Sequence, residues 1–146
     1  KGFDFSMFWQ GVYDQDVYNN QKFQTDFWAV NDPGSNKGTR LLNAWNTNNT
    51  SSSIPRLSTM NTAGEGRASS YCVENGSYLK LRTLQIGYDI PKSVLSKVKM
   101  SSARIYVSGQ NLLTIKSKSL TCSDPENPDW NYPLATSLSF GLQVGF

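Results

Sequence analysis

The stretch Ser137-Leu-Ser-Phe-Gly-Leu-Gln-Val-Gly-Phe146 decides the fold class. Every second residue in it is large and apolar, and the residues between them are small or polar. A period of two is that of a β-strand, whose successive side chains point to opposite faces of a sheet. The stretch therefore predicts a strand with one apolar face. That face carries Leu138, Phe140, Leu142, Val144 and Phe146.

Three further segments, 3–13, 78–90 and 103–114, alternate in the same way. In the segment 78–90 the apolar residues change parity between Leu81 and Leu84. A β-bulge near Arg82-Thr83 would return both halves to one face, because a bulge inserts one extra residue into a strand. We therefore predict an all-β chain with about four antiparallel strands.

The composition limits the function classes. Of the 146 residues, 38% are hydrophobic and 12% aromatic, and mean hydropathy is −0.47. No run of about 18 apolar residues exists, so the sequence predicts no transmembrane helix, but a transmembrane strand needs only about 9–11 alternating residues. The net charge of +3 is dispersed along the chain, which argues against nucleic-acid binding. Histidine is absent, and we assign no catalytic residue, cofactor or metal ligand.

The connections between the predicted strands alternate in length. Residues 91–101 form a short turn, with room for one helical turn, whereas 14–76 and 116–134 are long. A long connection without structure is unusual in a compact soluble domain. Barrels of the outer membrane, however, have short periplasmic turns and long extracellular loops. If the last strand ends at the periplasm, both long connections are extracellular.

The two cysteines, Cys72 and Cys122, both fall in these long connections. A disulfide between them is topologically allowed in an oxidising compartment. Two unpaired cysteines remain the alternative, since sequence does not give their separation.

Several stretches resemble the SusC/RagA-like TonB-dependent outer-membrane transporters of Bacteroidota. Val73-Glu-Asn-Gly-Ser-Tyr-Leu-Lys-Leu-Arg-Thr-Leu-Gln-Ile-Gly-Tyr-Asp-Ile-Pro91 is similar to a signature of that family, as is Arg104-Ile-Tyr-Val-Ser-Gly-Gln-Asn-Leu-Leu-Thr114. Gly2 to Tyr13, the Leu42 to Arg56 region and the Tyr132-Pro pair also match in order. Ala135 departs from the pattern, because the family often carries a basic residue after Tyr-Pro.

The resemblance implies that residues 1–146 are the C-terminal part of a large transmembrane β-barrel, with the plug domain and the N-terminal strands absent. It implies import of bulky nutrients, glycan oligosaccharides or peptides, across the bacterial outer membrane, and no enzymatic activity. The implied partners are a SusD-like surface lipoprotein, TonB–ExbBD acting through the missing N-terminal part, the barrel assembly machinery and outer-membrane lipid. Phe146 would belong to the signal that the assembly machinery reads.

Aromatic residues in the long connections are the candidate contacts for substrate or partner: Trp28, Trp45, Trp130 and Tyr132. The alternative is that they form small hydrophobic clusters within the loops. Trp9, Tyr13 and Phe3 could form interfacial girdles of a barrel wall. Four polar residues, Lys80, Arg82, Arg104 and Gln110, could face the barrel lumen.

Two other classes of protein compete with the transporter. One is a soluble all-β carbohydrate-binding or surface interaction module, which would bury the apolar face of the last strand in its own core. The other is a structural surface-layer protein built from a barrel fragment.

Overall fold

The computed structural model describes residues 2–27, 36–58, 60, 64, 66–129 and 131–146. The chain divides into two compact units. The first, here the sheet unit, comprises residues 1–13, 77–117 and 134–146, and the second, here the loop unit, comprises 14–76 and 118–133.

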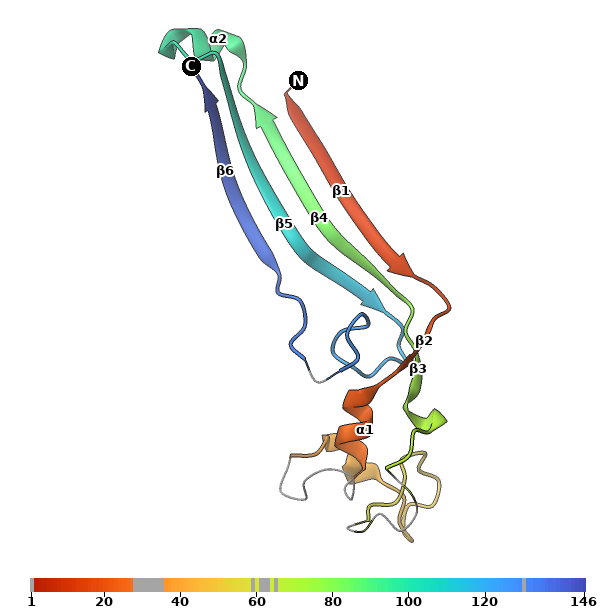
Figure 1. Cartoon of the computed structure of the whole chain (residues 1–146). Helices are drawn as coiled ribbons and strands as arrows, with labels where there is room; N and C mark the ends of the chain where they lie inside the picture. The colour runs from red at the N-terminus through yellow and green to blue at the C-terminus, as the bar shows by residue number, and fades with distance from the viewer. Residues whose placement is uncertain (1, 28–35, 59, 61–63, 65, 130) are drawn as a thin grey trace. The chain divides into compact units, whose positions relative to one another are not determined.

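The sheet unit contains one four-stranded antiparallel sheet in the order β1-β4-β5-β6 (Figure 1). Its strands are β1 (Phe3–Val12), β4 (Tyr78–Asp89), β5 (Ser102–Lys116) and β6 (Ser137–Gly145). Each of these four strands pairs with the one that follows it among the four along the chain. This is the pairing expected for consecutive antiparallel hairpins. The four predicted strands are therefore confirmed.

The predicted bulge is also present. The register of β4 against both neighbours shifts between Leu81 and Thr83, which leaves Arg82 as the extra residue. On β5 the same irregularity includes Asn111, whose φ of 51° lies in the left-handed region that asparagine tolerates better than most residues. The bulge keeps Leu79, Leu81 and Leu84 on one face of the sheet.

The apolar face of the sheet is exposed. Phe140 is 80% accessible and Phe5 is 60% accessible, and Ile105 and Val107 of β5 are also exposed. Among the described hydrophobic residues of the sheet unit, only Leu95 and Ala103 are buried. A soluble sandwich would cover such a face with a second layer. This sheet is thus a part of a larger structure and lacks a core of its own.

The short connection between β4 and β5 contains the predicted helical turn. Helix α2 (Lys92–Leu95) continues directly into the 3-10 turn η3 (Ser96–Val98), and Lys99 follows with a positive φ of 55°. Leu95 is the buried residue of α2.

The loop unit has structure that the sequence analysis missed, since that analysis identified 14–76 only as a long connection. Strands β2 (Asp16–Tyr18) and β3 (Val73–Asn75) pair antiparallel. Helix α1 (Asn20–Asp26) follows β2, and two 3-10 turns, η1 (Thr39–Asn43) and η2 (Ser70–Cys72), complete the unit. A small core lies inside it, formed by Phe27, Leu41, Ala44, Cys72, Leu120 and Cys122.

None of the helices in the described part of the chain combines the length and the apolar character needed to cross a bilayer.

Candidate functional site in the loop unit

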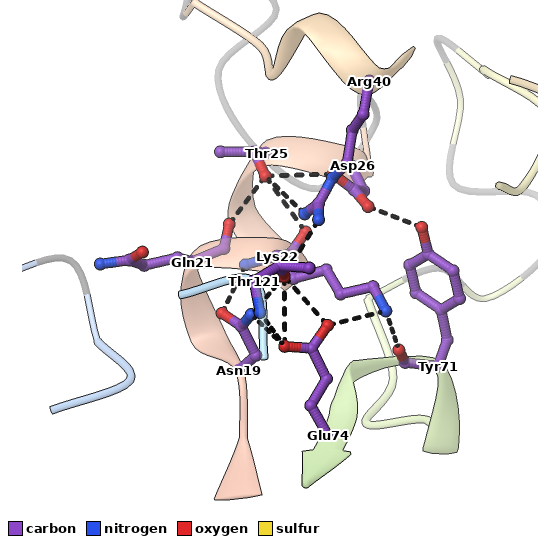
Figure 2. Close-up of polar contacts among 9 residues, drawn as sticks. All are labelled: Asn19, Gln21, Lys22, Thr25, Asp26, Arg40, Tyr71, Glu74 and Thr121. Carbon is purple, nitrogen blue, oxygen red and sulfur yellow. Dashed lines mark hydrogen bonds and ion pairs between the residues drawn. The ribbon is translucent and has the colours of Figure 1, made fainter. Parts of the chain in front are cut away.

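Asn19 is the centre of a buried polar network in the loop unit (Figure 2). It caps helix α1, because its Oδ1 accepts a hydrogen bond from the Lys22 backbone N–H at 2.9 Å. Its Nδ2 donates to Glu74 Oε2 at 2.8 Å and to Thr121 Oγ1 at 2.9 Å. Its backbone N–H donates to the Cys72 carbonyl at 2.7 Å. One side chain thus joins three segments that are far apart in the sequence.

Glu74 is the main acceptor of the network. It accepts from both the backbone N–H and the hydroxyl of Thr121, at 2.8 and 2.9 Å, and it pairs with Lys22 Nζ at 3.2 Å. Burial raises the pKa of Glu74, but the hydrogen bonds from Thr121 and Asn19 and the contact with Lys22 outweigh it, so the net pKa is lowered. Glu74 is therefore a carboxylate at neutral pH.

Asp26 and Tyr71 extend the network. Arg40 Nε donates to Asp26 Oδ1 at 2.7 Å, and the Tyr71 hydroxyl donates to Asp26 Oδ2 at 2.6 Å. Burial, followed by the hydrogen bond to the Asp26 carboxylate, raises the pKa of Tyr71 well above its usual range. Lys22 Nζ lies 4.0 Å from the centre of the Tyr71 ring and donates to the Tyr71 carbonyl at 2.6 Å. Contacts therefore fix both the hydroxyl group and the backbone carbonyl of Tyr71.

The network joins the two sequence segments of the loop unit. Thr121 belongs to segment 118–133, whereas Asn19, Glu74 and Arg40 belong to segment 14–76. The network contains two ion pairs, Lys22 with Glu74 and Arg40 with Asp26, and within each pair the opposite charges neutralise each other. The described residues contain no group of His, Cys, Asp and Glu side chains that could hold a metal ion. The arrangement supports the shape of the unit.

A separate groove in the loop unit contains Trp45. It has a volume of about 550 Å³ and combines apolar side chains with polar ones. Leu42 and Trp45 are exposed within it, and Arg56 and Asn46 supply a charge and an amide. The groove is lined by Leu41, Leu42, Ala44, Trp45, Asn46, Thr47, Arg56 and Leu57. An aromatic ring beside hydrogen-bonding groups suits either a peptide side chain or a sugar ring.

Tyr132, another predicted contact residue, does not line this groove and is 97% accessible. Trp28 and Trp130 lie outside the described residues. Of the two predicted contact residues that the structure describes, Trp45 is thus the one that lines this groove.

Cys72 and Cys122 are both fully buried in the loop unit, and no disulfide joins them in the structure. Burial raises the pKa of Cys72. A hydrogen bond with Tyr18 and the charge of Lys22 lower this pKa, but burial outweighs them. Cys122 Sγ lies 3.4 Å from the Asp124 carbonyl oxygen. The disulfide stays a prediction.

In the sheet unit, the basic residues predicted to face the lumen interact on the polar side of the sheet. Arg104 Nη2 pairs with Asp4 Oδ2 at 2.6 Å, reaching across Gly87 of the strand between them. Arg82 Nε donates to Gln10 Oε1 at 2.9 Å, and Lys80 is buried. Phe146 is 91% accessible. Lumen contact and the role of Phe146 as an assembly signal remain predictions.

Sequence reasoning missed the network around Asn19. Its members are ordinary polar residues, and the bonds that join Asn19, Glu74 and Thr121 span 47 to 102 positions in the sequence. The one local signal was Asn19 before a short helical segment, which is a typical N-cap residue.

Comparisons with known proteins find relatives among TonB-dependent receptors. No protein-family model matches this chain. TonB-dependent receptor P3 of Formosa agariphila is 35% identical over 114 residues, which is 78% of this chain and 10% of the relative. TonB-dependent receptor P26 of the same organism is 29% identical over 100% of this chain and 16% of the relative.

Solved structures give the same result. The RagAB peptide transporter matches 100% of this chain and 16% of its own chain, with a TM-score of 0.76 and 26% identity. The chain belongs to the SusC/RagA-like TonB-dependent receptors. The receptor chain also matches the RagAB peptide importer in its closed-closed state, with a TM-score of 0.75, and in its open-open state, with a TM-score of 0.72. It spans 10% to 16% of the length of the curated relatives.

Proposed function

We propose that this receptor chain is the C-terminal part of an outer-membrane importer of bulky nutrients, either peptides or glycan oligosaccharides. The observation that carries the proposal is the match of both units, sheet and loops together, to the RagAB peptide transporter. The importer would act with a SusD-like surface lipoprotein and would draw energy from TonB–ExbBD through parts of the protein outside this chain. It forms and breaks no bonds in its substrate.

The dimensions of the sheet support a membrane location. With a rise of about 3.3 Å per residue, the stretch of β4 from Leu79 to Tyr88 is roughly 30 Å long. At a tilt of about 40° it would cross roughly 23 Å, close to the roughly 25 Å apolar band of outer-membrane barrels. The exposed apolar face of the four strands would then face lipid. Its open edges, β1 and β6, would pair with further strands of the barrel, because unpaired backbone groups are costly in lipid.

Uptake by the full-length protein tests the transport proposal. A strain lacking the gene is compared with the complemented strain for energy-dependent uptake of labelled peptide mixtures and labelled oligosaccharides. We expect one of the two classes to enter only in the complemented strain, and a protonophore to abolish that entry. A product found only in the soluble fraction, or equal uptake in both strains, would refute the proposal.

We propose further that the groove around Trp45 contacts the substrate or the lipoprotein. Leu42→Ser is the sharpest variant, since Leu42 is highly exposed and its replacement leaves the core unchanged. It is expected to raise the KM for uptake or to reduce the amount of co-purified lipoprotein, with little change in the amount of receptor. Met60→Ser, at an exposed apolar residue of the loop unit that does not line the groove, is the matched control.

A further inference from the structure

The turn between β4 and β5, residues 91–101, concentrates positive charge at one end of the sheet. Lys92, Lys97 and Lys99 are all exposed, and the turn contains no Asp or Glu. None of the three forms an ion pair with another described residue. The charges nearest in the sequence are Asp89 and Arg104, and Arg104 is paired with Asp4. This end of the sheet therefore has an excess of cations.

Apolar side chains lie beside these lysines. Val94 of helix α2 is exposed, while Leu95 next to it is buried and anchors the turn. The Ser101 backbone N–H donates to the Gly145 carbonyl at 2.9 Å, which places the exposed Phe146 next to the turn. Figure 1 shows α2 and the end of β6 at the same end of the sheet. The surface, here the basic turn patch, combines Lys92, Lys97 and Lys99 with Val94 and Phe146.

We propose that the basic turn patch binds the phosphate headgroups of anionic phospholipids in the leaflet that surrounds this end of the sheet. This inference rests on the proposed outer-membrane location. Phe146 continues the alternation that gives β6 its exposed apolar face, so lipid that covers that face extends to the end of the sheet where the turn lies. A lysine stem can lie along apolar surface while its ammonium group reaches the phosphate level. With the predicted orientation, this leaflet is the periplasmic one.

The composition of the patch favours lipid over a protein partner. Three lysines in eight residues with exposed apolar neighbours suit the boundary between acyl chains and headgroups. Each basic residue near a charged surface strengthens binding to anionic lipid about fivefold. Removal of two lysines should therefore weaken binding roughly 25-fold.

Native mass spectrometry of the full-length receptor, purified from membranes in detergent, tests the proposal. Phosphatidylglycerol and phosphatidylcholine with identical acyl chains are titrated against the wild type, against Lys97→Gln/Lys99→Gln, and against Lys116→Gln/Lys118→Gln as a control with equal loss of charge. We expect the wild type to prefer phosphatidylglycerol and the first variant to lose roughly 25-fold of that preference, while the control retains it. Lack of preference in the wild type, or equal losses in both variants, would overturn the proposal.

A second measurement keeps the test independent of variant folding. Raising salt from about 0.05 M to 0.5 M should weaken phosphatidylglycerol binding to the wild type, because exposed charges are screened. Preferential binding of lipid A over phosphatidylglycerol, or loss of a co-purified acidic protein with unchanged lipid affinity, would contradict the assignment. If the receptor lies in the outer membrane and imports its substrate but shows no preference for anionic lipid, this inference alone is refuted. A water-soluble receptor refutes the proposed function.

Discussion

Asn19 shows how one residue can hold together a loop assembly that has little hydrophobic core. Its side chain is fully buried and serves the helix N-terminus, Glu74 and Thr121 at once. A buried group that loses its partner costs about 1–3 kcal/mol, and an N-cap adds about 1 kcal/mol. The substitution Asn19→Ala should therefore destabilise the loop unit by roughly 2–4 kcal/mol.

The measurement for Asn19→Ala is limited proteolysis of the full-length receptor, with cleavage sites assigned by mass spectrometry. We expect faster cleavage within 14–76 and 118–133 and an unchanged sheet unit. Asn48→Ala is the matched control. Asn48 is exposed, and its backbone N–H, which the substitution keeps, donates to Asn46 Oδ1. Equal cleavage of the two variants would show that the network contributes little.

Gly141 is a residue whose missing side chain is required by a neighbour. It pairs with Tyr106 on β5, and the Tyr106 ring occupies the space that a Cβ at Gly141 would need. Gly141→Val should therefore push the tyrosine ring off the sheet and disturb the pairing of β5 with β6. We expect less of the heat-modifiable folded form of the full-length receptor on SDS gels.

Two further variants identify the cause of that loss. Ser139→Val lies on the same strand and the same side, opposite Ser108, and should fold normally. The double variant Gly141→Val/Tyr106→Ala should recover folded receptor, since the obstructing ring is gone. If the double variant folds no better than Gly141→Val, the glycine is needed for another reason.

At the level of elements, the bulge lets β4 carry Arg82 as one extra residue without changing which side chains share a face. Deletion of Arg82 would remove that extra residue, so Leu79, Leu81 and Leu84 would stay on one face of an unbroken strand. Deletion of Gln85, which pairs with Ser6 and Ser108, would instead put Leu84 and Ile86 on opposite faces. We expect the receptor without Arg82 to assemble in the outer membrane and the receptor without Gln85 to fail, measured by quantitative immunoblotting of membrane fractions. Equal assembly of the two would refute a role of the bulge in setting the faces.

The same strand explains what could be predicted from the sequence. Strand alternation is a local property of neighbouring residues, so the four strands and the bulge near Arg82 were found without the structure. Of the groove at Trp45, the sequence analysis identified only the aromatic residue itself as a candidate contact. The other lining residues have no distinctive sequence pattern. The network around Asn19 depends on pairing across more than a hundred positions, which local patterns do not encode.

On the scale of the whole molecule, the two units rely on different forces. The sheet unit has an exposed apolar face and few buried hydrophobic residues, so its stability depends on surroundings supplied from outside the chain. The loop unit combines a small apolar core with buried ion pairs and hydrogen bonds. Loss of one partner from a buried ion pair costs about 3–5 kcal/mol. Changes in pH should therefore act mainly on the loop unit.

Glu74 sets the direction of that pH effect. Its pKa in the folded unit is lowered, whereas an unfolded glutamate titrates near about 4.3. The stabilisation is therefore fully present above about pH 4.3 and is lost as pH falls through the folded pKa, because the protonated acid no longer pairs with Lys22. Hydrogen exchange of residues 19–26 in the full-length receptor should be slow at pH 7 and, after correction for intrinsic rates, should become progressively less protected as the pH falls below about 4.3. Glu74→Gln should remove most of this pH dependence. A wild-type loop unit whose protection does not change as the pH falls would show that its stability comes from the apolar core and that the carboxylate is dispensable.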